Sequence, residues 1–174
     1  MTAQKNLRIL ALDISTSPGF AVLEVKTLKA GPRVKLLHVD HVKTDSNTPD
    51  SQRYAYIEAK TVQVVHEYGP FDVVCREHFT KGRSKRATQL VFGAWAAVDS
   101  ALGRYNYAIS EDNEFTPSAV KKAASRNGSA DKEDVEKGVR TLLKLPEDFV
   151  FTTDDESDAV AVGIAYLKSK GLIV

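Results

Sequence analysis

The stretch that decides the fold is LRILALDISTSPGFAVLEV, residues 7–25, in which two apolar runs flank a small-polar turn. Leu7 to Ile14 is rich in Leu and Ile, as buried β-strands are, and the Ser, Thr, Pro and Gly residues of Ser15 to Gly19 are typical of a turn. Phe20 to Val25 then reads as a second strand. The stretch therefore predicts a β-hairpin whose first strand ends at an acid, Asp13.

Downstream of this hairpin, the apolar spacing alternates between strand-like and helix-like periods. We expect a strand at Val34 to Val42, a helix at Ser51 to Tyr68, a strand at Phe71 to Glu77, a helix at Ala87 to Leu102 and a strand at Tyr105 to Ser110. Three further helices are expected to begin near Thr116 and Pro117, at Asp131, and at Asp154 or Asp155. This order predicts an α/β fold, a mixed sheet flanked by helices.

Length and composition restrict the class of protein. A chain of 174 residues favours one domain, and 43% hydrophobic with 27% charged residues is ordinary globular usage, which excludes wholesale disorder. The net charge of +1 creates no strong overall field. Any site for a polyanion must therefore be a local patch.

The single cysteine, Cys75, excludes an intramolecular disulfide and a multi-cysteine zinc site, which favours a reducing compartment. The longest apolar runs are about nine residues, whereas a membrane-spanning helix needs roughly 20. Arg8 and Asp13 interrupt the N-terminal apolar stretch, unlike a signal peptide. We therefore expect a cytoplasmic protein that makes no membrane contact.

Four acids fall where they can meet. Asp13 and Glu77 each stand at the end of a predicted strand, where a buried carboxylate is costly without a partner. Asp155 and Asp158 lie three residues apart and share one face of the last predicted helix. Each acid alone could be a turn or helix cap. Together they predict an all-oxygen site for two Mg²⁺ or Mn²⁺ ions, suited to phosphodiester hydrolysis.

Basic residues cluster near these acids. The segment from Arg76 through the polar loop Thr80 to Arg86 carries a local positive charge, contributed by Arg76, Lys81, Arg83, Lys85 and Arg86. The segment 118–144 is also basic and includes Lys122 and Arg126, whereas residues 147–158 carry acids and no Lys or Arg. Basic segments beside an acidic metal site fit a bound phosphate backbone, and a solvated surface loop is the alternative.

Two apolar features remain to be placed. Phe79 sits in the polar loop, where its ring could stack on an unpaired base, wedge a junction open or tuck beneath the loop. The helix Ala87 to Leu102 carries two apolar stripes, one of Val91, Trp95, Val98 and Leu102 and one of Leu90, Ala94, Ala97 and Ala101. One stripe can cover the sheet. The other could form a homodimer contact or be buried within the monomer.

With these motifs the chain resembles RuvC-type Holliday junction resolvases of the RNase H-like nuclease superfamily, over nearly its whole length. The resemblance rests on ILALDISTSPGFAVLE, VVCREHF, SAVKKAASRNGSADKEDVEKGVRTLLKL and DESDAVAVGIAYL, of which the third is the most specific. The turn after Asp13 is shorter than the family pattern, Phe79 lies one residue nearer to the acid, and Pro146 to Thr153 is longer. A divergent, phage-type member fits these departures.

The resemblance implies one RNase H-like nuclease domain over residues 1–174, with sheet order 3-2-1-4-5 and an antiparallel second strand. It implies that Mg²⁺, two ions per site with Mn²⁺ as a substitute, is held by Asp13, Glu77, Asp155 and Asp158. It also places Lys121 and Lys132 near the scissile phosphate. By the same resemblance the protein is a homodimer that nicks four-way DNA junctions symmetrically, with a branch-migration helicase as a candidate partner.

Other activities fit parts of the sequence. A fork or flap nuclease and an RNA:DNA hybrid nuclease would use the same fold and the same acids. A non-catalytic nucleic-acid binder would have no physical reason to keep four mutually repelling carboxylates. A sugar-kinase or actin-like phosphate-binding protein needs two domains around a nucleotide, and this chain is long enough for one. We therefore expect a nuclease, with its preference among branched substrates open.

Overall fold

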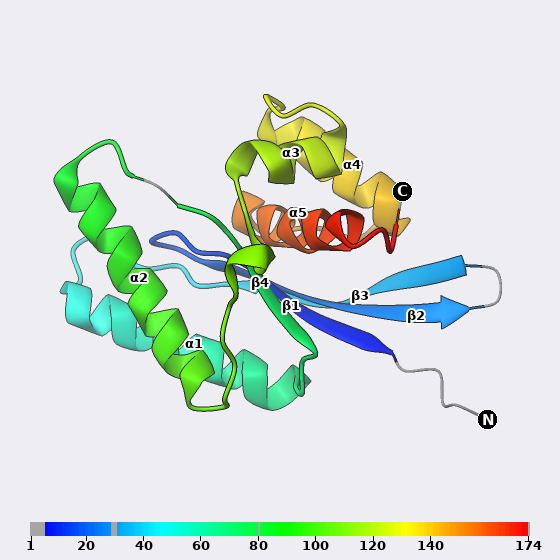
Figure 1. Ribbon diagram of the computed structural model, residues 1–174. Helices are drawn as coiled ribbons and strands as arrows, with labels where there is room; N and C mark the ends of the chain where they lie inside the picture. The colour runs from blue at the N-terminus through cyan, green and yellow to red at the C-terminus, as the bar shows by residue number, and fades with distance from the viewer. Residues whose placement is uncertain (1–5, 29–30, 80, 174) are drawn as a thin grey trace.

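The computed structural model describes residues 6–28, 31–79 and 81–173 and shows a central sheet with helices on both faces (Figure 1). The strands are β1 (Leu7–Asp13), β2 (Gly19–Leu28), β3 (Gly31–His41), β4 (Val73–Glu77) and β5 (Glu114–Phe115). The helices are α1 (Asp50–Tyr68), α2 (Lys85–Gly103), α3 (Pro117–Ser125), α4 (Lys132–Leu143), α5 (Asp154–Ser169) and the short 3-10 helix η1 (Glu111–Asn113).

The sheet has the strand order β3-β2-β1-β4-β5, which confirms the order and the mixed character expected from the sequence. β2 runs antiparallel to both β1 and β3, while β4 runs parallel to β1 and to β5. Asp13 pairs with Gly19, and Gly19 pairs with His41, so the carboxyl end of β1 lies beside the start of β2 and the end of β3. The two parallel neighbours β1 and β4 therefore end at the same edge of the sheet.

The alternating residues of β1 build two cores, one on each face of the sheet. Ile9 and Ala11 belong to the cluster that α3, α4 and α5 cover, whereas Leu10 and Leu12 belong to the cluster covered by α1 and α2. Figure 1 shows these two helical layers on opposite sides of the strands. Because both faces are buried, β1 is continuously apolar from Ile9 to Leu12 instead of alternating with polar residues. No helix in the described residues is long and apolar enough to cross a membrane.

The expected fifth strand at Tyr105 to Ser110 is wrong. That segment is a turn with Asn106 at φ 60°, followed by an irregular connection. The Tyr107 hydroxyl accepts a hydrogen bond from the backbone N–H of Phe71 at 2.9 Å, and Tyr107 and Ile109 pack against the core. The side chains of this segment, which are of types common in strands, therefore pack against the core, but its backbone does not pair with β4. The edge strand β5 forms later in the chain.

The helix α2 begins at Lys85, two residues earlier than expected, because the Ser84 hydroxyl caps it by accepting from the backbone N–H of Ala87 at 3.1 Å. Both apolar stripes are largely buried within the monomer, one at Ala94, Ala97 and Ala101 and the other at Val98 and Leu102. The most exposed large apolar side chain of α2 is Phe92, at 45%. The caps expected at Thr116 and Asp131 are confirmed for α3 and α4. α5 begins at Asp154.

Candidate active site

The four candidate carboxylates lie around the edge of the sheet where β1 and β4 end. β1 ends at Asp13 and β4 ends at Glu77, while Asp155 and Asp158 come from the first turns of α5, which packs on both strands. All four side chains are partly exposed. The site is therefore built by two adjacent strand ends and one helix that crosses them.

Electrostatic interactions link Asp13 to the other three acids. Burial raises the pKa of Asp13 well above the ordinary value of an aspartate. The negative charges of Glu77, Asp158 and Asp155 raise this pKa further, in that order, and Lys132 opposes the rise. The strand ends and the first turns of α5 therefore place the other three acids within range of electrostatic interaction with Asp13.

The other three acids experience the same environment. Burial, and then the charge of Asp158, raises the pKa of Glu77 to about 7, while Lys121 acts in the opposite direction. Burial is also the main cause that raises the pKa of Asp155 and of Asp158. The protein surroundings therefore disfavour the ionised form of each of these acids, and a bound cation would offset this effect.

The donor set fits a hard divalent ion, since it consists of carboxylate oxygens at one solvent-accessible edge. In the part of the chain that the structure describes, no three His, Cys, Asp or Glu side chains are close enough to form a ready-made metal site. Binding of an ion between these acids therefore requires their side chains to turn toward one another. All four acids are carried by strand ends or by a helix.

Two lysines flank the acids. Lys132 opens α4, and its Nζ lies 3.1 Å from Oδ2 of Asp154 and 3.9 Å from Oδ2 of Asp158. Burial lowers the pKa of Lys132, but the hydrogen bond with Asp154 and the nearby acids outweigh it and raise the pKa. Lys121 on α3 interacts electrostatically with Glu77 and Asp158. Both candidate lysines are thus brought to the carboxylates.

Sequence reasoning missed the role of Gly19, which it treated only as part of a turn. A Cβ on this residue would lie 1.9 Å from the backbone carbonyl oxygen of Asp155, a distance that no real contact reaches. Gly19 also pairs with Asp13 across the sheet. Its missing side chain therefore lets the first turn of α5 lie directly against the strands that carry the other acids.

Sequence reasoning also missed a pair that holds the start of α5. Glu156 is only 4% exposed. Its Oε1 lies 2.9 Å from Nδ1 of His41 at the end of β3, and its Oε2 accepts a hydrogen bond from the backbone N–H of Thr152 at 2.7 Å. This buried contact holds the first turn of α5, which carries Asp155, against the end of β3. His41 and Glu156 are 115 positions apart in the chain, so no local sequence pattern predicts their contact.

Phe79 lies near the site but packs against the protein. Its ring makes an edge contact with Phe92 of α2, with centroids 5.5 Å apart. Arg76 is committed to structure, because its guanidinium pairs with Asp99 and Glu114 and lies over the ring of Trp95. Arg76, one of the basic residues of the segment predicted to be positively charged, therefore forms ion pairs within the protein.

The other expected basic residues lie on the surface. Lys81, Arg83, Lys85, Arg86, Lys122 and Arg126 are all exposed. Arg86 pairs with Asp50 of α1 at 2.6 Å, and Arg126 ends α3 in a left-handed conformation at φ 67°. No hydrogen bond or ion pair among the described residues links these six side chains to the four acids. Thr80, which opens the expected basic loop, lies outside the described residues.

Comparison with known proteins gives a consistent result across sequence and structure. The family model for crossover junction endodeoxyribonuclease RuvC matches residues 9–166. RuvC from Rickettsia massiliae (strain Mtu5) is 32% identical over 163 residues, which cover 93% of this chain and 98% of the relative. RuvC from Dehalococcoides mccartyi is 32% identical over 161 residues, covering 92% of each chain.

The solved structures agree. Thermus thermophilus RuvC superposes with a TM-score of 0.74 at 26% identity, covering 95% of this chain and 97% of the other. The T. thermophilus RuvC in complex with a Holliday junction substrate gives a TM-score of 0.77 at the same identity and coverage. These neighbours confirm the RNase H-like sheet expected from the sequence. The chain therefore belongs to the RuvC family of crossover junction endodeoxyribonucleases.

Proposed function

We propose that this protein is a divalent-metal-dependent endodeoxyribonuclease that resolves four-way DNA junctions by paired, symmetric nicks. The observation that carries the proposal is the mutual electrostatic interaction of Asp13, Glu77, Asp155 and Asp158 at one sheet edge, flanked by two lysines. Membership of the RuvC family and the likeness to a RuvC bound to a Holliday junction substrate support the choice of substrate.

The four acids would hold Mg²⁺, two ions per site, with Mn²⁺ as a substitute. Bound there, the ions supply an activated water and stabilise the leaving oxygen. The water oxygen forms a bond to phosphorus while the bond to the 3′ oxygen breaks, which leaves 5′-phosphate and 3′-hydroxyl ends. Lys132 and Lys121, which lie beside the acids, would stabilise the charge that develops on the scissile phosphate.

The exposed basic residues would hold the DNA arms outside the site. Lys81, Arg83, Lys85, Arg86, Lys122 and Arg126 supply positive charge suited to phosphate contacts. Phe79 would stack on a base or open the junction. Because the Phe79 ring makes an edge contact with Phe92, this contact would have to break, or both rings would have to move together, for Phe79 to reach a base.

Paired nicks require two sites, so we propose a homodimer. Phe92 supports this assembly because it is a large apolar side chain left 45% exposed on α2. We further propose that residues 1–174 act as one nuclease domain in the cytoplasm. A branch-migration helicase is a candidate partner.

A cleavage assay separates this function from its alternatives. Four-way, three-way, fork or flap, duplex and RNA:DNA hybrid substrates of matched length are incubated with the protein and Mg²⁺. The proposal predicts fastest cleavage of the four-way junction, at symmetric positions. Faster cleavage of forks or flaps, or of hybrids, would assign the corresponding alternative activity. Binding of junctions with no cleavage in Mg²⁺ or Mn²⁺ would indicate a non-catalytic binder.

A further inference from the structure

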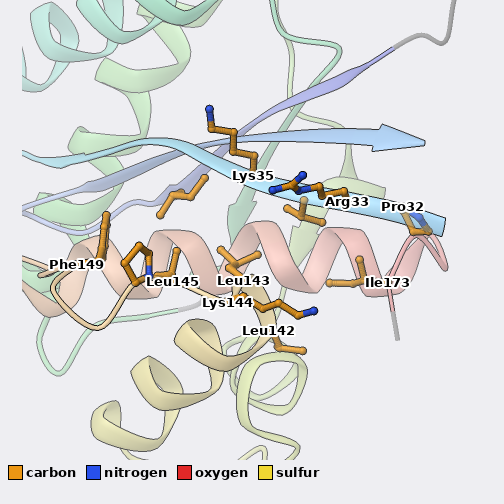
Figure 2. Close-up of a pocket in the computed structure, with 12 residues that line it drawn as sticks. Pro32, Arg33, Lys35, Leu142, Leu143, Lys144, Leu145, Phe149 and Ile173 are labelled. Atoms are coloured by element: carbon orange, nitrogen blue, oxygen red, sulfur yellow. The ribbon is translucent and has the colours of Figure 1, made fainter. Parts of the chain in front are cut away.

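A groove of about 690 Å³ runs beside the start of β3 (Figure 2). Its apolar lining comes from Val34 and Leu36 of β3, Leu143 and Leu145 at the end of α4, and Phe149 and Ile173. All six side chains are partly exposed. Partly exposed apolar residues that line a hollow are typical of a binding surface.

The groove lies at the opposite end of the sheet from the acids. Val34 pairs with Val25, which pairs with Leu7, whereas Asp13 pairs with Gly19 at the other end of β1. The six-residue separation along β1 corresponds to about 20 Å at the rise of a β-strand. The groove is therefore separate from the proposed nuclease site, and an inference about it does not depend on the nuclease activity.

One wall of the groove is an open sheet edge. β3 is the terminal strand of the sheet. Within the described chain, the backbone hydrogen bonds of residues 31–40 are those made to β2. In an antiparallel pair, every second residue points its N–H and C=O groups away from the neighbouring strand. The outer edge of β3 thus presents donors and acceptors that another extended chain can pair with.

The charged residues of the groove carry one sign. Figure 2 shows Arg33 and Lys35 on the strand and Lys144 on the opposite side, beside Leu142 and Leu143. No acid among the described residues lines the groove. Among the residues that the structure describes, none of these three cations forms an ion pair. The groove therefore combines an apolar floor with a positive rim that has no internal partner.

We propose that this groove binds an extended acidic segment of another protein, which adds to the sheet beside β3. Backbone pairing would supply register, and alternate apolar side chains would enter the groove. The acids between them would lie on the other face of the added strand, beside Arg33 and Lys35. A second copy of the chain fits poorly, because antiparallel pairing of two β3 edges would bring their own Arg33 and Lys35 together. A DNA backbone would leave the apolar floor unused.

The test uses an eight-residue peptide with Val or Leu at alternate positions and Asp or Glu between them. Its binding to the ¹⁵N-labelled full-length protein is followed by NMR. We expect saturable shifts confined to the amides of residues 31–37, 142–149 and 173. Two control peptides carry Lys in place of the acids, or methyl groups on alternate backbone nitrogens. Each control should bind at least tenfold more weakly.

Protein variants complete the test. The double variant Arg33→Glu and Lys35→Glu, and separately Leu142→Gln, should each weaken binding of the acidic peptide at least tenfold. Lys137→Glu, an exposed charge reversal outside the groove on α4, should leave binding unchanged. Retained junction cleavage and an otherwise unchanged spectrum show that each variant is folded.

Several outcomes would overturn the proposal. They are absence of saturable shifts at the groove, equal binding of the acidic and the lysine peptide, and equal binding of the N-methylated peptide. Groove shifts produced by junction DNA but not by the acidic peptide would assign the surface to DNA. Shifts that appear only as the protein concentration rises would assign it to a second copy.

Discussion

At the scale of single residues, the site is governed by unbalanced negative charge. Glu77 and Asp13 lie at strand ends where burial and neighbouring acids both disfavour ionisation. Lys132 and Lys121 oppose this effect, yet the pKa values of all four acids remain raised. A divalent cation would supply the missing positive charge, and the metal-free protein should therefore carry a stability penalty at neutral pH.

That penalty has a defined pH dependence. The pKa of Glu77 is about 7 in the folded chain, against about 4.5 when unfolded. Folded protein keeps a proton that the unfolded chain releases, so this group favours folding below pH 4.5, and the contribution is lost as pH rises through 7. In the presence of a chelator, Glu77→Gln should therefore become more stable than the unmodified protein as pH rises from 5 to 8, measured by thermal unfolding. A stability difference that does not grow with pH would contradict the raised pKa.

A second residue-scale prediction concerns Lys132. Lys132→Ala should lower the single-turnover cleavage rate on the order of 100-fold, because it removes a cation beside the reacting phosphate. Junction affinity, measured in parallel, should change much less. Lys137→Ala on the same helix is the matched control and should retain the rate. Lost affinity with an unchanged rate at saturating protein would reassign Lys132 to ordinary phosphate contact.

At the scale of elements, the position of α5 decides whether the acids converge. Two contacts fix its first turn, the glycine gap at Gly19 and the buried pair of His41 with Glu156. Gly19, His41 and Glu156 are not among the candidate metal ligands, but both contacts act on the backbone at or beside Asp155. The geometry of the site thus depends on packing between this helix and the antiparallel half of the sheet.

The glycine gap gives an element-scale prediction. Gly19→Ala should destabilise the protein by about 1–3 kcal/mol, because the new methyl group would occupy the position of the Asp155 carbonyl and push α5 away. It should also raise the Mg²⁺ concentration needed for half-maximal cleavage. Gly103→Ala, where a Cβ meets nothing within 4 Å, is the control. Unchanged stability and metal requirement in Gly19→Ala would show that the close approach is unimportant.

Local rules account for what could be predicted at this scale. The hairpin, the helix caps at Thr116 and Asp131 and the strand-end acids follow from residue type and short spacing. The segment 105–110 has the residue types of a strand, but its Tyr107 bonds to Phe71 instead, a choice made by packing. The pair of His41 and Glu156 joins distant parts of the chain, so only the folded arrangement reveals it.

At the scale of the whole molecule, the two helical layers differ in which candidate site residues they carry. The layer of α3, α4 and α5 carries two of the candidate acids and both candidate lysines, whereas α1 and α2 cover the other face of the sheet (Figure 1). The sequence predicted two apolar stripes on α2 but not which residues the monomer buries. The packing of α2 on α1 and the sheet buries Ala94, Ala97 and Ala101 and leaves Phe92 exposed.

The exposed ring leads to a prediction about assembly. If Phe92 lies in a homodimer contact, Phe92→Glu should give folded monomers by light scattering, because burying a charge there is costly. Such monomers should nick junctions once instead of in pairs. Ala96→Glu, one turn further along the exposed side of α2, should act in the same way without touching Phe79. An unmodified protein that is monomeric both free and on a junction would refute the dimer.

The central claim is that the four carboxylates form one metal-dependent site for junction cleavage. Its most direct test compares the unmodified protein with Asp13→Asn on a four-way junction in Mg²⁺, measuring affinity and mapping the cleaved ends. We predict paired nicks with 5′-phosphate and 3′-hydroxyl ends for the unmodified protein, and equal affinity without cleavage for Asp13→Asn. Cleavage by Asp13→Asn at the unmodified rate, or 3′-phosphate ends from the unmodified protein, would contradict the claim.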